Sequence, residues 1–523
     1  MARNYAAGPP TAARSPLRAT ARSCEDAVVA RKGWAAALIG TIVTAAGGYL
    51  AVQAAGRRRD DGPLTSSSRA ARTVQLARIG SSAGAGLAVH KARRALAPES
   101  RREALDAEFQ LKTAEQVAEV LGGMKGALMK LGQMASFLDQ GLPEPVRDAL
   151  AQLQADAPPM SSELARRTVE AELGRPVAEL FASWDDRPLA AASIGQVHRA
   201  VAHDGREVAV KVQYPGVGEA IKADLDNAGL LIQVIGMLFP GMDPGPIVAE
   251  LRARLTEELD YTREAADQRR FRDAYVDHPY FHVPAVVDEL CSARVLTSEL
   301  ATGARFAELA GWSQEERDLA GETIYRFVFR SLWRHLMFNG DPHPGNYLFR
   351  PGGHVTFLDF GLVKHFAPGE LDPLADMLLA SVFTKDRAAL RSGAVRAGFL
   401  GPEAAVDDDA LYEYLSHFYE FVAEDEELTI TPNWSAEAVR RYFDQSGGFA
   451  EVQRVLNVPG NYVIVQRINL GLLGVLGALG ATRNWRRIAS ELWPWVDGPP
   501  STPMGEAEAA WLARRAAAGR AGS

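Results

Sequence analysis

Cysteine is nearly absent from this chain, whose 523 residues contain only Cys24 and Cys291. Two cysteines so far apart exclude a disulfide framework and a thiolate zinc site, and they fit a protein body in a reducing compartment. The 47% hydrophobic and 23% charged residues are ordinary globular values, which argues against a polytopic membrane protein and against wholesale disorder. The length predicts about two to four domains, or one large bilobal unit with extensions.

An overall surplus of positive charge is also missing, because the net charge is -8. Residues 1–99 carry 15 Lys and Arg against 5 Asp and Glu, so this segment has a charge of +10 and the remainder -18. An acidic body argues against a nucleic-acid-binding protein, which needs clustered Lys and Arg for phosphate contacts. The basic front instead predicts anionic lipid headgroups as a partner.

Residues 33–56 form an uncharged run of 24 residues between basic flanks. At about 1.5 Å per residue, a helix of this length would cross the roughly 30 Å hydrocarbon layer. The run is only weakly apolar, so an interfacial helix, a late-starting signal sequence and a soluble Ala-rich helix remain alternatives. We interpret residues 1–70 as a basic leader with a candidate single-pass anchor, and we expect a membrane-associated protein with a cytoplasmic catalytic domain. Positive charge on both flanks leaves the orientation open.

A small mixed domain is predicted for residues 161–300. Strand patterns over Ser193–Ala202 and Glu207–Val212 are joined by an Asp-Gly pair, which is a strong hairpin signal. In the second strand three valines alternate with other residues and share one face, so Lys211 projects from the opposite face. Further strands are predicted at Val283–Val287 and Val295–Glu299.

A mostly helical second domain is predicted for residues 301–497. It opens with a strongly apolar helix over Asp318–Phe338, which we expect to be its buried axis. A turn-rich loop and a short hairpin follow, closed by Asp359-Phe360-Gly361. The apolar stretch Ile468–Ala481 is short for a membrane span and indicates a core helix. Residues 498–523 are polar and are predicted to form a flexible tail.

The order of chemical groups along the two domains is that of a protein-kinase-like ATP site. ATP needs a cation that reaches its phosphates, and Mg²⁺ needs oxygen ligands. Lys211 is the candidate cation, Asn346 and Asp359 are the candidate metal ligands, and Asp341 is the candidate to orient or deprotonate a nucleophile. Each motif alone is weak, but their order and spacing predict an α+β, bilobal kinase-like fold that binds ATP and Mg²⁺.

The chain resembles the UbiB/AarF/ADCK family of atypical kinase-like proteins over about residues 72–485. The motifs that carry the resemblance are Lys130-Leu131-Gly132-Gln133, Ala190–His198, Val208–Lys211, Glu258–Ala265, Gly340–Asn346 and Leu358–Gly361. The resemblance implies that residues 71–160 are a family-specific helical extension.

The resemblance also implies roles for individual residues. Glu264 would pair with Lys211, and the Lys130 segment would form a lid over the cleft that contacts Glu258 and Asp260. The residues implied in nucleotide binding, in addition to Lys211, are Lys130, Gln133, Ala191, Ala192, Ser193, Gly195, Gln196, Glu258, Asp260 and Glu299.

The loop over the phosphates departs from ordinary protein kinases. Where those proteins carry several glycines, this chain has three alanines and Gly195, and each Cβ restricts a close approach of the backbone to phosphate. The chain also has no Ala-Pro-Glu element after Asp359-Phe360-Gly361. We therefore expect that a protein is a poor substrate.

The function expected from these features is an ATPase or a small-molecule or lipid-directed kinase. The family resemblance implies that it acts in isoprenoid quinone or lipid metabolism. Quinone-like lipids and biosynthetic enzymes are the expected partners, and the sequence leaves open whether the chain forms a homodimer. A nucleotide-gated, non-catalytic lipid-binding scaffold is the alternative. A metal hydrolase using Asp341, His343 and Asp359 is less favoured, because no HExxH-type spacing accompanies these residues.

Overall fold

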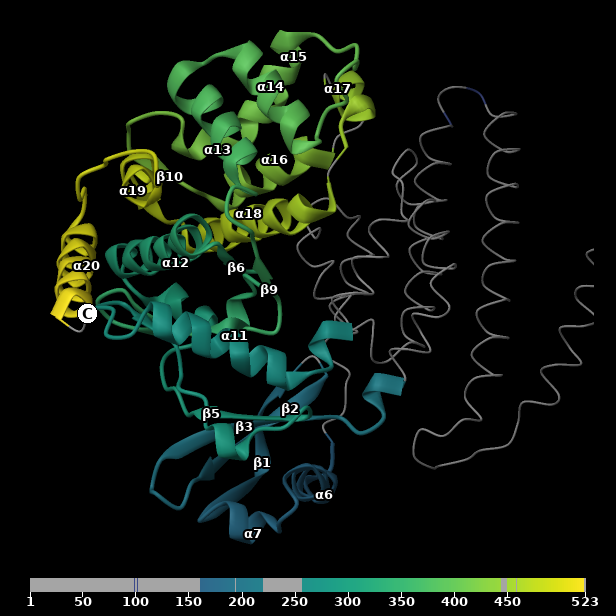
Figure 1. The fold of residues 1–523 in the computed structure, drawn as a ribbon, viewed down its shortest axis with the longest axis vertical. Helices are drawn as coiled ribbons and strands as arrows, with labels where there is room; N and C mark the ends of the chain where they lie inside the picture. Colours follow the sequence, from purple (N-terminus) through teal and green to yellow (C-terminus); the bar gives the residue numbers. More distant parts are fainter. Residues whose placement is uncertain are drawn as a thin grey trace, which may run out of the picture. The chain divides into compact units, whose positions relative to one another are not determined.

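The computed structural model describes residues 98, 101, 160–192, 194–219, 256–443, 449–457 and 459–521. These residues fall within one compact unit of the chain. Figure 1 shows a small lobe built on a β-sheet, drawn in blue, and a larger helical lobe drawn in green and yellow. The two lobes are called the N-lobe (residues 161–300) and the C-lobe (residues 301–497).

The N-lobe sheet has four antiparallel strands in the order β1-β2-β3-β5. The strands are β1 Ser183–Ala192, β2 Gly195–Val201, β3 Glu207–Gln213 and β5 Val295–Glu299. The predicted hairpin is confirmed, with Gly205 at a φ of 88° that favours glycine. The sequence pattern missed β1, because this strand is mostly exposed and lacks an apolar alternation.

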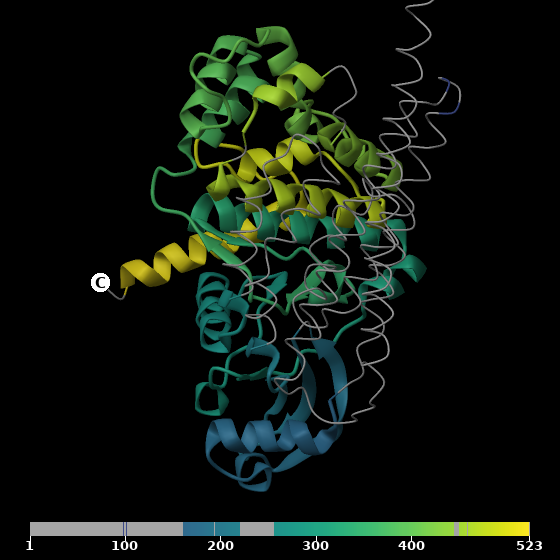
Figure 2. The same cartoon turned by 90° about the vertical axis from the view of Figure 1, so that its right-hand side faces the viewer.

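The two faces of the sheet are covered by different helices. Helices α6 (Ser162–Leu173) and α7 (Val177–Leu180) cover the face that carries the three valines of β3, and Figure 2 shows α6 in blue across this side of the sheet. The opposite face carries Lys211 and meets helix α11 (Tyr261–Ala274). The period of two therefore sends Lys211 toward α11 while the valines build the core.

Helix α12 (Gln314–His335) is the buried axis of the C-lobe, as predicted. It contacts α18 (Gly460–Leu479) and α19 (Trp485–Leu492), and Figures 1 and 2 both show α12 and α18 side by side. The predicted core helix is confirmed as part of α18, whose Ile468, Leu472 and Leu476 are buried. α12 ends at Leu336, which has a left-handed φ of 52° and turns the chain into the next strand.

Short strands follow α12 and hold the loop that carries Asp341. The predicted hairpin is confirmed as β7 (Tyr347–Arg350) and β8 (His354–Phe357). β8 also pairs with β4 (Phe281–His282), and β6 (Met337–Asn339) pairs with β9 (Val363–His365). The strand predicted at residues 283–287 is wrong, because only Val286 there forms a single bridge.

The remaining elements complete both lobes. They are η2 Asp288–Leu290, η3 Phe306–Gly311, η4 Pro344–Asn346, α13 Asp372–Leu379, the π-helix η5 Ala380–Thr384, α14 Arg387–Ala397, α15 Asp408–Ser416, η6 His417–Val422, β10 Leu428–Thr429, α16 Pro432–Phe443, α17 Ala450–Val455 and β11 Thr482–Arg483.

The prediction of a flexible tail from residue 498 is wrong, because residues Pro503–Ala521 form helix α20. Met504 and Trp511 are buried against the rest of the protein, and Glu508 is only 1% exposed. The sequence concealed this docking because the few large apolar side chains of this Ala-rich helix make no clear periodic stripe.

The candidate anchor at residues 33–56 and most of the extension at residues 71–160 lie outside the described residues. Among the helices that the structure does describe, none is both long and apolar enough to cross a membrane.

Candidate active site

The centre of the site is an ion pair between β3 and α11. Lys211 Nζ donates to Glu264 Oε1 at 2.7 Å and to Oε2 at 2.9 Å. The Lys211 side chain is 16% exposed and that of Glu264 is 3% exposed. The strand register places Lys211 opposite Leu296, on the face that α11 covers. Glu264 lies in the first turn of α11, so the helix brings its carboxylate to the ammonium.

Asp359 completes the cluster from the C-lobe. Its Oδ2 lies 3.5 Å from Lys211 Nζ, and its Oδ1 accepts a hydrogen bond from the Gly361 backbone N–H at 2.9 Å. A Cβ on Gly361 would lie 3.2 Å from Asp359 Oδ1 and 3.4 Å from Glu264 Oε2, so a larger residue would crowd both carboxylates. Both lobes therefore contribute to one charged cluster.

The two carboxylates keep Lys211 protonated. Burial by itself would lower the pKa of Lys211, but Asp359 and Glu264 outweigh burial and hold that pKa well above its usual range. Burial raises the pKa of Glu264 to about 7, and this increase persists although Lys211 opposes it. The cluster therefore presents a charged ammonium that two acidic groups orient.

The loop after β6 is tied to Asp359 through backbone groups. Asn339 Nδ2 donates to the Asp359 carbonyl at 2.8 Å, and Asn339 Oδ1 accepts from the Asp341 N–H at 3.3 Å. Asn346 Nδ2 donates to the Asp341 carbonyl at 3.2 Å, and the Leu358 N–H donates to the Asn346 carbonyl at 3.0 Å. The β7–β8 hairpin thus holds Asp341, Asn346 and Asp359 at one edge.

This arrangement agrees with the comparisons to known proteins. Residues 152–393 match the ABC1 atypical kinase-like domain. The solved structure of Rv3197 from Mycobacterium tuberculosis, in complex with erythromycin, is similar with a TM-score of 0.55 and 34% sequence identity, covering 75% of this chain and 98% of that chain. The chain belongs to the ABC1 atypical kinase-like family. The resemblance to the UbiB/AarF/ADCK proteins and the α+β kinase-like fold are therefore confirmed.

Curated members of the family are similar over shorter stretches. The mitochondrial atypical kinase COQ8B of Rattus norvegicus is 37% identical over 270 residues, which are 51% of each chain. The mitochondrial atypical kinase coq-8 of Caenorhabditis elegans is 32% identical over 335 residues, 61% of this chain and 44% of that protein. The mitochondrial atypical kinase COQ8 of Saccharomyces cerevisiae is 31% identical over 288 residues. The chain spans about half the length of these curated relatives.

The side-chain oxygens of Asn346 and Asp359 are chemically suited to bind the Mg²⁺ that ATP-dependent kinase-like proteins use. An amide oxygen from Asn346 and a carboxylate from Asp359 are hard ligands of the kind Mg²⁺ prefers, and the hairpin holds both residues at the same edge. Bound Mg²⁺ would neutralise charge on the phosphates of ATP. Within the described part of the chain, no group of three or more His, Cys, Asp or Glu side chains is placed to hold a metal ion.

The hairpin between β1 and β2 carries the alanines that the sequence predicted to lie over the phosphates. Ala191 is exposed and Ala192 pairs with Gly195 at the end of the hairpin, whereas Ser193 lies outside the described residues. A Cβ at Gly195 would lie 2.1 Å from the Val212 carbonyl oxygen. The close approach of β3 therefore requires glycine at position 195. The sequence predicted only a nucleotide contact for Gly195 and not this packing role.

Gln196 lies on the core face of the sheet, and its predicted contact with nucleotide stays a prediction. Gln196 pairs with Val212 across the sheet, so it shares the core face with the valines and not the face of Lys211. Its side chain is 1% exposed, and its Nε2 contacts the Met160 carbonyl and the His198 ring.

The side chain of Glu299 also points away from the cluster. Glu299 pairs with Val208 on the core face, and its Oε2 accepts from the Ala285 N–H at 3.2 Å. Its Oε1 lies 3.3 Å from His282 Nε2, and this contact lowers the pKa of Glu299. The structure thus places this side chain against His282 and Ala285, and the predicted contact of Glu299 with the cofactor stays a prediction.

The predicted lid interaction would join residues outside the described part of the chain to residues inside it. Lys130 and Gln133 lie outside it. Asp260 is the N-cap of α11, and its Oδ1 accepts from the Thr262 N–H and hydroxyl at 3.0 and 2.6 Å. Glu258 lies close enough to Glu264 to raise that residue's pKa. Asp260 thus has a structural role at the helix terminus that carries Glu264.

Three residues of the site were missed by the sequence reasoning. Asn339 joins the Asp341 loop to Asp359, and the Tyr261 ring lies 5.0 Å from Lys211 Nζ. Phe360 is fully buried, with its ring 5.0 Å from that of Phe271 on α11. Asn339 precedes Gly340, a pair that indicates only the end of a helix, so the sequence contained no signal for its role. The position of Phe360 inside the Asp359-Phe360-Gly361 motif could have indicated that it belongs to the site.

Proposed function

We propose that this chain is a Mg-ATP-binding atypical kinase or ATPase that acts on a small molecule or lipid. The observation that supports this proposal best is the cluster of Lys211, Glu264 and Asp359, which joins both lobes in one site. A buried, oriented ammonium beside a candidate Mg²⁺ ligand is the arrangement that binding and transfer of a phosphoryl group require.

Each residue has a distinct role in this proposal. Lys211 contacts the phosphates of ATP while Glu264 holds the ammonium in position. Asp341, which is 7% exposed, accepts the proton from the attacking hydroxyl or water. A bond then forms between that oxygen and the γ-phosphorus, while the bond from this phosphorus to the bridging oxygen breaks and ADP leaves.

Two features favour a small acceptor over a protein. Ala191 and Ala192 lie in the strand end that leads to the phosphate loop, where added Cβ atoms limit how closely the backbone approaches phosphate. The segment after Asp359-Phe360-Gly361 forms β9 and soon enters α13, and it lacks an Ala-Pro-Glu element. These features support water or a small hydroxyl compound as the acceptor.

The proposed setting is isoprenoid quinone or lipid metabolism at a membrane. Its support is the family membership and the charge of +10 on residues 1–99, which suits anionic headgroups. Quinone-like lipids and the enzymes that modify them are the proposed partners.

ATP turnover by the purified full-length chain tests the proposal, with and without anionic liposomes and a quinone-like lipid. We expect turnover in the wild type and its loss in Asp359→Asn, which weakens the Mg²⁺ ligand. The matched control is Asp376→Asn, an exposed aspartate of α13 that pairs with Arg396. This control should keep wild-type turnover.

Thermal stability separates the catalytic proposal from the scaffold alternative. A nucleotide-gated scaffold would be stabilised by ATP according to RT ln(1 + [L]/Kd) and would release no phosphate. Stabilisation without turnover under all lipid conditions would replace the enzyme proposal with the scaffold. Absence of both would contradict ATP binding itself.

A further inference from the structure

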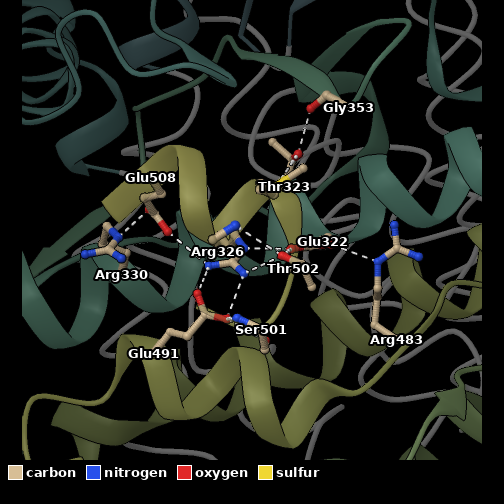
Figure 3. A network of polar contacts seen from close by, with 12 residues as sticks. Glu322, Thr323, Arg326, Arg330, Gly353, Arg483, Glu491, Ser501, Thr502 and Glu508 are labelled. Atoms are coloured by element: carbon tan, nitrogen blue, oxygen red, sulfur yellow. Dashed lines mark hydrogen bonds and ion pairs between the residues drawn. The ribbon is translucent and has the colours of Figure 1, made fainter. Parts of the chain in front are cut away.

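Helix α20 is anchored to the axis of the C-lobe by buried charges. Glu508 accepts from Arg326 Nη1 at 3.0 Å and from Arg330 Nε, and both arginines belong to α12. Figure 3 shows Glu508 directed toward these two guanidinium groups, with Glu491 and Thr502 also around Arg326. The C-terminal helix is therefore held by specific bonds.

Beyond this anchor, α20 reaches the C-terminal end of α11. Arg515 Nη1 donates to the Ala274 carbonyl at 3.0 Å, and its Nη2 donates to the Asp273 carbonyl at 3.1 Å. Trp511 Nε1 donates to the Val276 carbonyl at 3.0 Å. The last carbonyls of a helix have no intrahelical partner, and a cation near them also interacts favourably with the helix dipole. Arg515 thus caps α11 from another helix.

Glu508 contacts the segment after α11 through His278. The His278 Nδ1 accepts from the N–H groups of Tyr280 and Phe281 at 3.2 and 3.1 Å. Because Nδ1 is an acceptor, we assign the proton to Nε2, which donates to Glu508 Oε1 at 3.3 Å. One carboxylate therefore links α20, α12 and the end of α11.

The same α11 carries Glu264 at its other end. Its buried residues Tyr261, Glu264, Ala265, Gln268 and Phe271 form one stripe along the helix. A helix transmits a shift at one end along its axis because its backbone bonds keep it stiff. The contacts of α20 with the end of α11 therefore influence the position of the Glu264 carboxylate relative to Lys211.

We propose that α20 sets the position of α11, and that Arg515 and Trp511 are positioning residues for the Glu264–Lys211 pair. The consequence for catalysis rests on the proposed function, whereas the positioning itself does not. Loss of the cap would loosen the final turn of α11 and allow Glu264 to move relative to Lys211. Binding of ATP would weaken because the ammonium would be less well oriented.

The test compares Arg515→Ala with Arg514→Ala in the full-length chain. Both residues are exposed arginines of α20, but only Arg515 donates to the carbonyls of α11 among the bonds described. Hydrogen exchange of residues 261–275 should speed up about fivefold or more in Arg515→Ala and stay at the wild-type rate in Arg514→Ala. Arg515→Lys should restore slower exchange, since an ammonium can donate to the same carbonyls.

Kinetics and a second variant complete the test. Arg515→Ala should raise the KM for ATP about threefold to tenfold, with a smaller change in kcat, because the ground-state contact with phosphate is affected. Trp511→Phe keeps an aromatic ring but removes the donor to Val276, so it should also speed exchange in α11. This variant provides the answer if Arg515→Ala does not fold.

The outcomes separate the two proposals. Equal exchange of α11 in wild type, Arg515→Ala and Trp511→Phe would overturn the positioning role. Faster exchange in these variants, together with no ATP turnover or binding by the wild type, would support the positioning role and contradict the proposed function.

Discussion

The protein contains two largely buried charge clusters that are built from similar groups but differ in their access to solvent. The cluster of Lys211, Glu264 and Asp359 joins the lobes, and its Lys211 and Asp359 side chains are 16% and 22% exposed. The cluster around Arg326 joins three helices of the C-terminal half, and the Arg326 side chain is fully buried. Burial of charge is common to both, but access from solvent is not.

The clusters also differ in how completely their donors are used. Arg326 makes five hydrogen bonds, to Glu322, Glu491, Glu508 and Thr502, which engage every N–H of its guanidinium. The Lys211 ammonium contacts the two oxygens of Glu264 and lies at the longer distance of 3.5 Å from Asp359. A buried cluster whose donors are all bonded holds the fold together, whereas an accessible cluster with one long contact can exchange partners with a ligand.

The largest effect is expected from breaking the closed cluster. Arg326→Met should lower the free energy of unfolding by about 3–5 kcal/mol, because it leaves Glu322, Glu491 and Glu508 buried without their shared cation. Urea unfolding followed by circular dichroism measures this change. The control Arg387→Met removes an exposed pair with Asp409 and should change stability by less than about 1 kcal/mol. Similar small losses in both variants would contradict the structural role of the Arg326 cluster.

Breaking the accessible cluster should affect turnover more than stability. Lys211→Met should reduce ATP turnover about 100-fold or more, because the ammonium that contacts phosphate is lost. Its unfolding free energy should change by less than about 2 kcal/mol. Asp359 is 22% exposed and can recruit water, and the buried Glu264, whose pKa is already raised to about 7, can take up a proton once its cation is gone. Phosphate release and urea unfolding on the same preparation provide both values. A large loss of stability with little loss of turnover would reverse the comparison.

Acid titration sharpens the comparison at Glu508. Burial by itself would raise the pKa of Glu508, but His278, Arg330 and Arg326 lower it to about 2. Because the folded-state pKa lies below the unfolded one, this carboxylate stabilises the fold above about pH 4.5 and loses that contribution as the pH falls toward 2. Wild type should therefore lose about 2 kcal/mol more stability than Glu508→Gln between pH 7 and 3. Parallel urea unfolding curves of the two proteins across this range would contradict the assignment.

The smallest effect is expected at the alanine loop. Ala192 pairs with Gly195 at the hairpin end, and Ala192→Gly removes a Cβ that limits the approach of backbone to phosphate. ATP affinity should increase about threefold, which thermal shift titration with ATP measures. Ala182→Gly, just before the other end of β1, is the control for added backbone freedom and should leave affinity unchanged. An equal response of both variants would show that the alanines do not restrain the site.

Most site elements could be predicted because their signals are local. The alternation in β3 predicted the face of Lys211, and the turn residues between β7 and β8 predicted the hairpin that holds Asn346 and Asp359. The core-facing position of Gln196 was also predictable, since pairing across the β2–β3 hairpin places Val197 opposite Lys211 and sends Gln196 to the other face. The face on which Glu299 lies follows only from the register of β5, which no local turn specifies.

By itself the sequence determined the short-range features of this protein: the period of two in β3, the apolar axis α12, the turns, and the order of the charged motifs. The tertiary structure decided which distant groups meet. Lys211 and Asp359 are 148 residues apart in the chain, and Arg515 lies 242 residues beyond the Asp273 carbonyl that it caps. Local propensity carries no information on such contacts, because they form only when the elements pack and bury their polar groups against specific partners.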